Sequence, residues 1–134
     1  MSIQLEQALI HVVDDDEAIR SSLARLGEAR GWQVRPYASA RAFLAERPSP
    51  AGRPECLVLD LQLPDMNGAQ LLEALTASGW HIATIVLTAW PDSNLARRAL
   101  DAGAIRIVPK PFAPGDWLRA VEETLSPADR SALS

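Results

Sequence analysis

One stretch of this 134-residue chain decides its fold: Leu57-Val58-Leu59-Asp60-Leu61-Gln62-Leu63-Pro64-Asp65-Met66-Asn67-Gly68. The apolar residues before Asp60 are typical of a strand that is buried on both faces. The strand ends at a lone carboxylate, and a proline, a turn and a glycine follow it. Because a charge at the tip of a buried strand is costly unless it is compensated, Asp60 needs partners elsewhere in the chain.

Strand-like and helix-like patterns alternate from one end of the chain to the other. Short apolar runs occupy residues 9–13, 56–60, 84–88 and 105–108, and residues 32–37 alternate like a half-exposed strand. Apolar residues at helical spacing follow each run. Five such alternations predict an α/β domain with a parallel sheet, helices on both faces and right-handed crossovers.

Turn and cap residues set the expected boundaries of these elements. The expected helix N-caps are Asp16, Ser39 and either Asp92 or Ser93, and glycines at 31, 79 and 103 end three of the helices. Pro36 predicts that the second strand lies at an edge of the sheet, because proline cannot donate to a strand ladder. Residues 48–54 are rich in proline and predict a surface loop.

Composition narrows the class of protein. The chain has 48% hydrophobic residues and a net charge of -4, which argues against nucleic acid as a direct partner of this segment. It has neither an apolar run long enough for a bilayer nor a secretory signal pattern. The single cysteine, Cys56, fits a cytoplasmic protein and is expected to be a buried packing residue.

We expect one domain over residues 1–126. Residues 127–134 then form a short tail, which either ends a stand-alone domain or begins a linker to an output domain.

Polar residues follow four of the predicted strands. They are Asp14 and Asp15, Asp60, Thr88, and Lys110. Because the carboxyl ends of parallel strands meet at one edge, these side chains are expected to converge there. Three carboxylates repel one another unless a cation intervenes, and oxygen ligands suit Mg²⁺. Lys110, the only lysine in the chain, supplies a further positive charge.

These groups together suit phosphoryl transfer. In this interpretation Asp60 attacks phosphorus, the metal and Lys110 neutralise the phosphoryl oxygens, and the Thr88 hydroxyl donates to one of them. Each residue alone also has a plain structural explanation: a helix start for the acidic run, a strand end for Thr88 and a surface position for Lys110. Their coincidence at one predicted edge favours a site.

The same residues resemble the receiver domain of two-component response regulators, and the FixJ-like type in particular. Four motifs carry the resemblance: Val12-Val13-Asp14-Asp15-Asp16-Glu17, residues 58–68 of the stretch quoted above, Ile85-Val86-Leu87-Thr88 and Lys110-Pro111-Phe112. The resemblance covers residues 9–125. It implies the flavodoxin-like (βα)5 fold, a doubly wound five-stranded parallel sheet in the order 2-1-3-4-5.

The resemblance also implies how a metal is held. Asp15 and Asp60 bind Mg²⁺ directly, together with the backbone carbonyl of Gln62, and Asp14 holds a metal-bound water. A sensor histidine kinase phosphorylates Asp60, and Thr88 and Lys110 contact the phosphoryl group.

The resemblance also implies a backbone feature next to Lys110 and the kind of output that the domain controls. The family implies a *cis* Lys110–Pro111 bond, output through transcription regulation and, in many members, a phosphorylation-dependent homodimer. No membrane partner is expected.

Two positions depart from the family pattern. Ile107 stands where most receivers have a phenylalanine or tyrosine ring that swings inward on phosphorylation, so we expect a muted or differently routed switch. Trp90 and Gln62 occupy the two variable positions beside the phosphoryl group. A bulky Trp90 could shield an acyl phosphate from water and slow its loss, or it could pack on the fourth helix.

Three other functions compete with this one. A haloacid-dehalogenase-type phosphatase needs a second aspartate two residues after the nucleophile, where this chain has Gln62. A flavodoxin-like flavin binder needs a glycine- and hydroxyl-rich loop after the first strand, where this chain has the acidic residues 14–17. A degenerate receiver that serves only as a protein-docking module is the remaining alternative, although all of the expected site residues are present.

Overall fold

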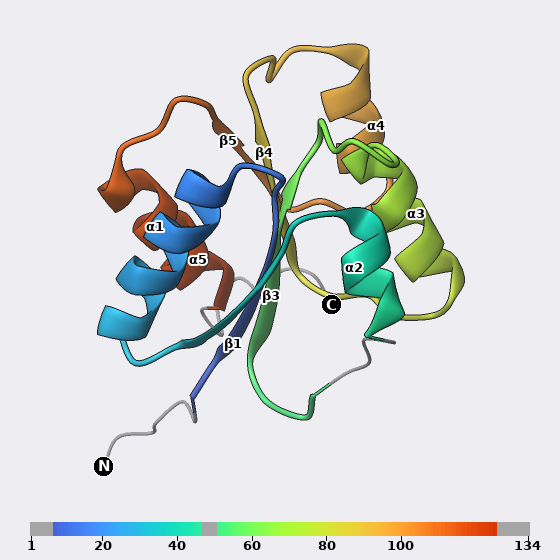
Figure 1. Cartoon of the computed structure of the whole chain (residues 1–134). Coiled ribbons are helices and arrows are strands. Elements are labelled where there is room, and N and C mark those ends of the chain that lie inside the picture. Colours follow the sequence, from blue (N-terminus) through green and yellow to red (C-terminus); the bar gives the residue numbers. More distant parts are fainter. Residues whose placement is uncertain (1–6, 47–50, 126–134) are drawn as a thin grey trace.

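A computed structural model of the chain describes residues 7–46 and 51–125, and it confirms the predicted fold class. Five parallel strands form one sheet in the order β2-β1-β3-β4-β5 (Figure 1). The elements are β1 (Leu9–Val13), α1 (Glu17–Ala29), β2 (Gln33–Tyr37), α2 (Ala40–Ala45), β3 (Glu55–Asp60), α3 (Gly68–Ala77), β4 (Thr84–Thr88), α4 (Asn94–Asp101), β5 (Arg106–Pro109) and α5 (Pro114–Leu125).

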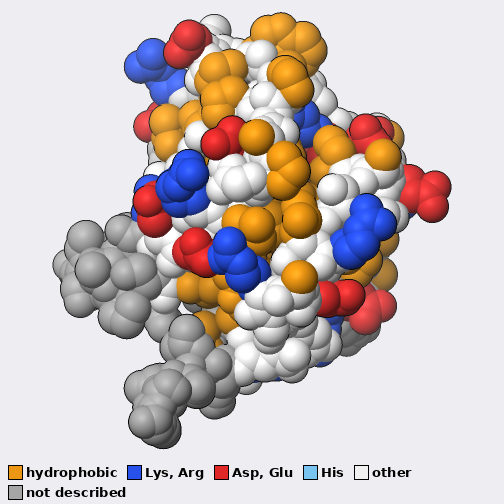
Figure 2. All heavy atoms as spheres, turned by 90° about the vertical axis from the view of Figure 1, so that its left-hand side faces the viewer, with side chains coloured by type: hydrophobic (Ala, Val, Ile, Leu, Met, Phe, Trp, Pro, Cys, Tyr) orange, Lys and Arg blue, Asp and Glu red, His pale blue; other side chains and the backbone are white. Residues whose placement is uncertain are grey.

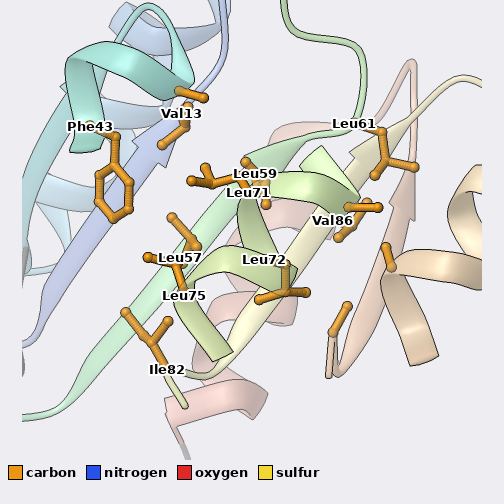
Figure 3. Close-up of a cluster of buried hydrophobic side chains, with 14 of the residues drawn as sticks. Val13, Phe43, Leu57, Leu59, Leu61, Leu71, Leu72, Leu75, Ile82 and Val86 are labelled. Atoms are coloured by element: carbon orange, nitrogen blue, oxygen red, sulfur yellow. The ribbon is translucent and has the colours of Figure 1, made fainter. Parts of the chain in front are cut away.

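The helices form a layer on each face of the sheet. Helices α1 and α5 cover one face, and α2, α3 and α4 cover the other (Figure 1). Successive side chains of a strand point to opposite faces, so Val58 packs on the α1 and α5 side while Leu57 and Leu59 pack on the other. Figure 3 shows Leu57 and Leu59 among the leucines of α3. Because β3 is covered on both faces, it is buried throughout most of its length.

The predicted boundaries hold to within a residue or two. Asp16 caps α1, Ser39 caps α2, and Ser93 rather than Asp92 caps α4. The glycines predicted to end α1, α3 and α4 all have positive φ, the conformation that follows many helix ends. Strand β2 lies at a sheet edge, as Pro36 predicts, and β5 begins at Arg106 rather than one residue earlier.

Asp65 gives α2 a second cap that the sequence did not indicate. Its two carboxylate oxygens accept hydrogen bonds from the backbone N–H groups of Ala40 at 3.2 Å and Arg41 at 2.7 Å. Burial alone would raise the pKa of Asp65, but these backbone hydrogen bonds lower it. The loop that follows Asp60 is therefore tied to the start of α2.

Other predictions divide into those confirmed and those that fall outside the described residues. Cys56 is fully buried, and burial raises the pKa of its thiol to about 12, as expected for a packing residue. Residues 48–50 of the predicted loop and the whole predicted tail lie outside the described ranges. Within those ranges, every helix is too short or too polar to cross a membrane.

His11 lies buried in the middle of β1, outside the cluster of residues at the carboxyl edge. Its Nε2 atom is 2.9 Å from the Glu55 carboxylate, and the rings of Tyr37, Phe43 and Trp80 lie around it. Its Nδ1 atom has no hydrogen-bond partner among the described residues. Burial lowers the pKa of His11, and this effect outweighs the opposing effect of Glu55.

We predict that His11 makes the domain less stable in mild acid. The unfolded chain takes up a proton at His11 near pH 6.5, whereas the folded chain resists protonation until lower pH. The free energy of unfolding therefore falls as the pH drops below about 6.5.

This loss is expected to be absent in His11→Gln, which keeps a donor for Glu55 but cannot titrate. Urea unfolding at pH 7.5 and pH 5 measures the difference, and His81→Gln, at an exposed histidine, is the matched control. Arg35 and Arg53, the other charged groups near the ring, are unchanged in both variants. Equal pH dependence in wild type and His11→Gln would contradict the prediction.

Candidate functional site

The predicted site residues converge at the carboxyl edge of the sheet. Asp14 directly follows β1, and Asp60 and Thr88 are the last residues of β3 and β4. Lys110 follows β5 and pairs through its backbone N–H with the Thr88 carbonyl at 2.8 Å. Asp14, Asp60 and Thr88 are all buried, whereas Asp15 is exposed. The fold thus brings together residues that are up to 96 positions apart in sequence.

Lys110 bridges the two buried carboxylates. Its Nζ atom lies 3.0 Å from Asp14 Oδ2 and 3.5 Å from Asp60 Oδ2. Burial alone would lower the pKa of the Lys110 ammonium, but Asp14 and Asp60 raise it above its usual value. The side chain therefore remains a cation throughout the physiological range.

One ammonium does not compensate all the negative charge at this edge. Burial raises the pKa of Asp60 to about 6, and the neighbouring Asp14 and Asp15 add to that effect. A hydrogen bond from the Gln62 N–H to Asp60 Oδ1, at 3.0 Å, opposes it only in part. Asp60 is therefore harder to ionise than an ordinary aspartate, and a further cation at this edge would favour its ionised form.

The acidic cluster has the dimensions of a site for one cation. One carboxylate oxygen from each of Asp14, Asp15 and Asp60 lies within 4.8 Å of the others. Two ligands on opposite sides of Mg²⁺, each bonded at about 2.1 Å, lie roughly 4.2 Å apart. An all-oxygen donor set beside an uncompensated charge therefore fits a small, hard divalent ion.

Trp90 borders the open side of this edge. The ring is 61% exposed and lines a cleft of about 440 Å³ with Asp15, Asp60, Gln62 and Lys110. Its backbone N–H donates to the Thr88 hydroxyl oxygen at 3.0 Å. So large an exposed area does not fit packing on α4, and it leaves the ring in the wall of the cleft.

Ile107 lies in the middle of β5, beside Val86 of β4. The side chain is partly buried and packs against the cluster that covers the α2, α3 and α4 face. An aliphatic side chain thus fills the position at which the resemblance to receiver domains implies an aromatic ring.

Gly68 is the last residue of the stretch that decides the fold. It allows the start of α3 to lie very close to the backbone of Asp60 and Leu61. A Cβ atom at this position would lie 2.7 Å from the Asp60 carbonyl oxygen and 3.0 Å from Leu61 Cα. The Gly68 N–H also donates to the Leu61 carbonyl at 3.0 Å. The first turn of α3 can therefore rest directly on the backbone at Asp60 and Leu61 only because residue 68 has no side chain.

Comparisons with known proteins agree with this geometry. Residues 10–122 match the family described as the response regulator receiver domain. The chain is 41% identical over 121 residues to the transcriptional regulatory protein FixJ of *Azorhizobium caulinodans*, covering 90% of this chain and 56% of that protein. It is 40% identical over 113 residues to FixJ of *Rhizobium meliloti*, covering 84% and 54%. The chain thus spans about half the length of these curated relatives.

Solved structures give the same result. The crystal structure of FixJ-N aligns with a TM-score of 0.79 and 38% identity, covering 90% of this chain and 94% of that one. A CheY-like receiver domain protein from *Methanospirillum hungatei* aligns with a TM-score of 0.83 and 29% identity, covering 94% and 99%. The fold and its acidic edge define a doubly wound signalling domain. The chain belongs to the response regulator receiver family, and within that family it is FixJ-like.

The *cis* bond between Lys110 and Pro111 is present, as the resemblance implies. Two contacts near the site escaped prediction. Gly68 could have been noticed because glycine is a poor residue for the start of a helix. Arg20, which donates to the Asp14 carbonyl at 2.9 Å, lies one turn beyond the predicted cap Asp16, and this spacing was the available signal.

We predict that Gly68→Ala destabilises the domain by about 1–3 kcal/mol, the usual cost of forcing a methyl group into a packed site. Gly115→Ala is the matched control, because a Cβ there meets nothing within 4 Å and alanine favours helix α5. Urea unfolding measures both changes. The prediction fails if the two variants are equally stable.

Proposed function

We propose that Asp60 accepts a phosphoryl group from a sensor histidine kinase and that Mg²⁺ is required for the transfer. One observation carries the proposal: the carboxylate of Asp60 ends a buried strand 3.5 Å from a lysine ammonium and inside a cluster of oxygens sized for a divalent ion. Membership of the receiver family supports it and implies a histidine kinase as partner.

The acidic residues would hold the metal ion, and Asp60 would also take the phosphoryl group. Asp15, Asp60 and the Gln62 carbonyl would hold Mg²⁺ directly, and Asp14 would hold it through water. The ion supplies positive charge to the phosphoryl oxygens. An Asp60 oxygen bonds to phosphorus as the bond from phosphorus to the donor nitrogen breaks, and that nitrogen keeps the electron pair. Asp60 needs no general base, since a metal-bound carboxylate is already ionised.

Lys110 and Thr88 act on the group that is transferred. The Lys110 ammonium already points at the Asp60 carboxylate and can follow the charge onto the phosphoryl oxygens. The Thr88 hydroxyl accepts the Trp90 N–H and keeps its own proton free to donate. Both side chains stand at strand ends, where the sheet fixes their positions.

An apolar groove beside the site suits the helix surface of a kinase. It has a volume of about 500 Å³ and runs between α1 and the segment after β5, with Ile19, Leu23 and Leu26 on one side and Phe112 on the other. Figure 2 shows hydrophobic side chains gathered in a band on this face. Lys110 lines both the groove and the cleft, so a donor docked in the groove would lie next to Asp60.

The wider role follows from the relatives. The two FixJ relatives are transcriptional regulatory proteins, and this chain matches about half of each. We therefore propose that phosphorylation of Asp60 controls transcription in the cytoplasm, with a phosphorylation-dependent homodimer as the switched form. With its acidic balance, this segment is not expected to contact nucleic acid itself. Since Ile107 cannot report by ring rotation, the switch relies on Thr88.

The proposal predicts phosphorylation in vitro. Incubation with Mg²⁺ and acetyl phosphate should add one phosphoryl group, seen by intact mass spectrometry. The gain should be lost in Asp60→Ala and when EDTA replaces Mg²⁺, and it should persist in Asp92→Asn, which changes an exposed carboxylate outside the cluster. No mass gain in the wild type would favour the docking-module alternative.

Trp90 is predicted to protect the phosphorylated form. Because its ring lines the cleft over Asp60, it limits the approach of water to an acyl phosphate. Trp90→Ala should shorten the lifetime of phospho-Asp60 several-fold, and Trp90→Phe should restore most of it. Loss of the phosphoryl group is followed by intact mass after donor removal. A lifetime in Trp90→Ala that is unchanged or longer counts against the shielding role.

A further inference from the structure

The strongest feature that the phosphoryl chemistry leaves unexplained is Arg20, on the first turns of α1. Its Nη1 atom donates to the backbone carbonyl of Asp14 at 2.9 Å. Arg20 is partly buried, and its backbone N–H pairs with the Asp16 carbonyl at 3.0 Å. A cation thus lies against the acidic loop, yet it bonds to the backbone there and not to a carboxylate.

Every polar group of Asp14 is engaged. Its N–H donates to the Tyr37 carbonyl, Oδ1 accepts the Asp16 N–H, and Oδ2 accepts the Lys110 ammonium. The contact from Arg20 to the carbonyl completes this set. Asp14 is thereby fixed from β2, from its own loop, from the segment after β5 and from α1.

Asp15 is held in a different way. Its side chain is exposed and forms no hydrogen bond with the other described residues. The Asp14 carbonyl and the Asp15 N–H belong to one planar peptide unit. Holding that carbonyl therefore holds the peptide plane to which the Asp15 Cα is attached, and so narrows the directions open to a carboxylate of the acidic cluster.

We propose that Arg20 is a positioning residue that aims the Asp15 carboxylate at the divalent cation by holding the Asp14–Asp15 peptide plane. The inference rests on the proposed function, which makes Asp15 a metal ligand. Magnesium demands near-ideal octahedral geometry, so its affinity is sensitive to the direction of each ligand. Groups that orient metal ligands change the affinity by about 10- to 100-fold when they are removed.

The sign of the effect distinguishes positioning from charge. A guanidinium near a divalent cation repels it, so removal of Arg20 would strengthen metal binding if charge alone mattered. Loss of positioning has the opposite effect. A weaker affinity in Arg20→Ala can therefore arise from orientation and not from the lost charge.

The test measures Mg²⁺ affinity in the whole chain, without any phosphoryl donor, by fluorescence titration with MgCl₂. Trp90, in the cleft, provides the signal. Arg20→Ala should bind Mg²⁺ about tenfold more weakly than wild type. Arg25→Ala removes the same charge from an exposed position on the same helix and should bind within twofold of wild type. If Arg20→Ala does not fold by circular dichroism, Arg20→Gln takes its place with the same expectation.

A double-mutant cycle identifies the route of the effect. In an Asp15→Asn background, Arg20→Ala should cost less than twofold, because the carboxylate that it aims is gone. An affinity in Arg20→Ala equal to or tighter than that of wild type overturns the inference, and so does an undiminished tenfold loss in the Asp15→Asn background. A wild type that binds no Mg²⁺ contradicts the proposed function as well, whereas normal wild-type binding with an unaffected Arg20→Ala contradicts only the role of Arg20.

Discussion

Electrostatic repulsion among three carboxylates at one sheet edge is the constraint around which this domain is built. Asp14 and Asp60 are buried there, and Asp15 lies within ligand distance of both. In water such a cluster would disperse, but here each member is attached to a strand end or to the loop that follows it. Lys110 relieves part of the repulsion through short contacts to the two buried members. What remains is negative charge that the described residues do not compensate, and the fold keeps it in place.

The surrounding structure keeps that unfavourable arrangement in place. Strands β1 and β3 are neighbours in the sheet, so their charged ends cannot separate without breaking ladder hydrogen bonds. Gly68 lets α3 rest on the Asp60 loop, and Asp65 ties the same loop to α2. On the other face of the sheet, the start of α1 is fixed to the acidic loop by Asp16, whose carboxylate accepts hydrogen bonds from the N–H groups of Ala18 and Ile19. The core therefore contributes rigidity to the site as well as stability to the domain.

Most of this arrangement could be predicted from the sequence, for physical reasons that differ from residue to residue. Strands such as β4 are recognisable from a short, mostly apolar run of residues. Helix starts are recognisable from a capping residue such as Ser39, directly before the helix. Both signals are local, so the order of the elements and the helix starts can be predicted from the sequence. The gathering of Asp60, Thr88 and Lys110 needed only the rule that parallel strands end at one edge. The strand order itself came from the family resemblance.

Other contacts could not be predicted because they depend on three-dimensional separation rather than on spacing. Asp65 meets α2 across 25 residues of sequence, and nothing in its neighbours indicates which amide groups it will reach. Arg20 looks like any solvated helix arginine until the backbone position of Asp14 is known. The buried pair of His11 and Glu55 is likewise 44 residues apart. Sequence patterns predict elements and edges well, and they predict particular side-chain partners poorly.

The direction of α5 has a consequence for how a signal would leave the domain. Every strand of the parallel sheet points toward the acidic edge, and α5 runs back along the sheet to Leu125 (Figure 1). Near the end of α5, the Thr124 hydroxyl accepts a hydrogen bond of 3.0 Å from Nε of Arg106, the first residue of β5. Helix α5 therefore ends away from the carboxyl edge of the sheet, at which Asp60 stands. A change at the acidic edge would have to reach Leu125 through the packed layers, by way of α5 residues such as Trp117 and Val121 that pack on the sheet.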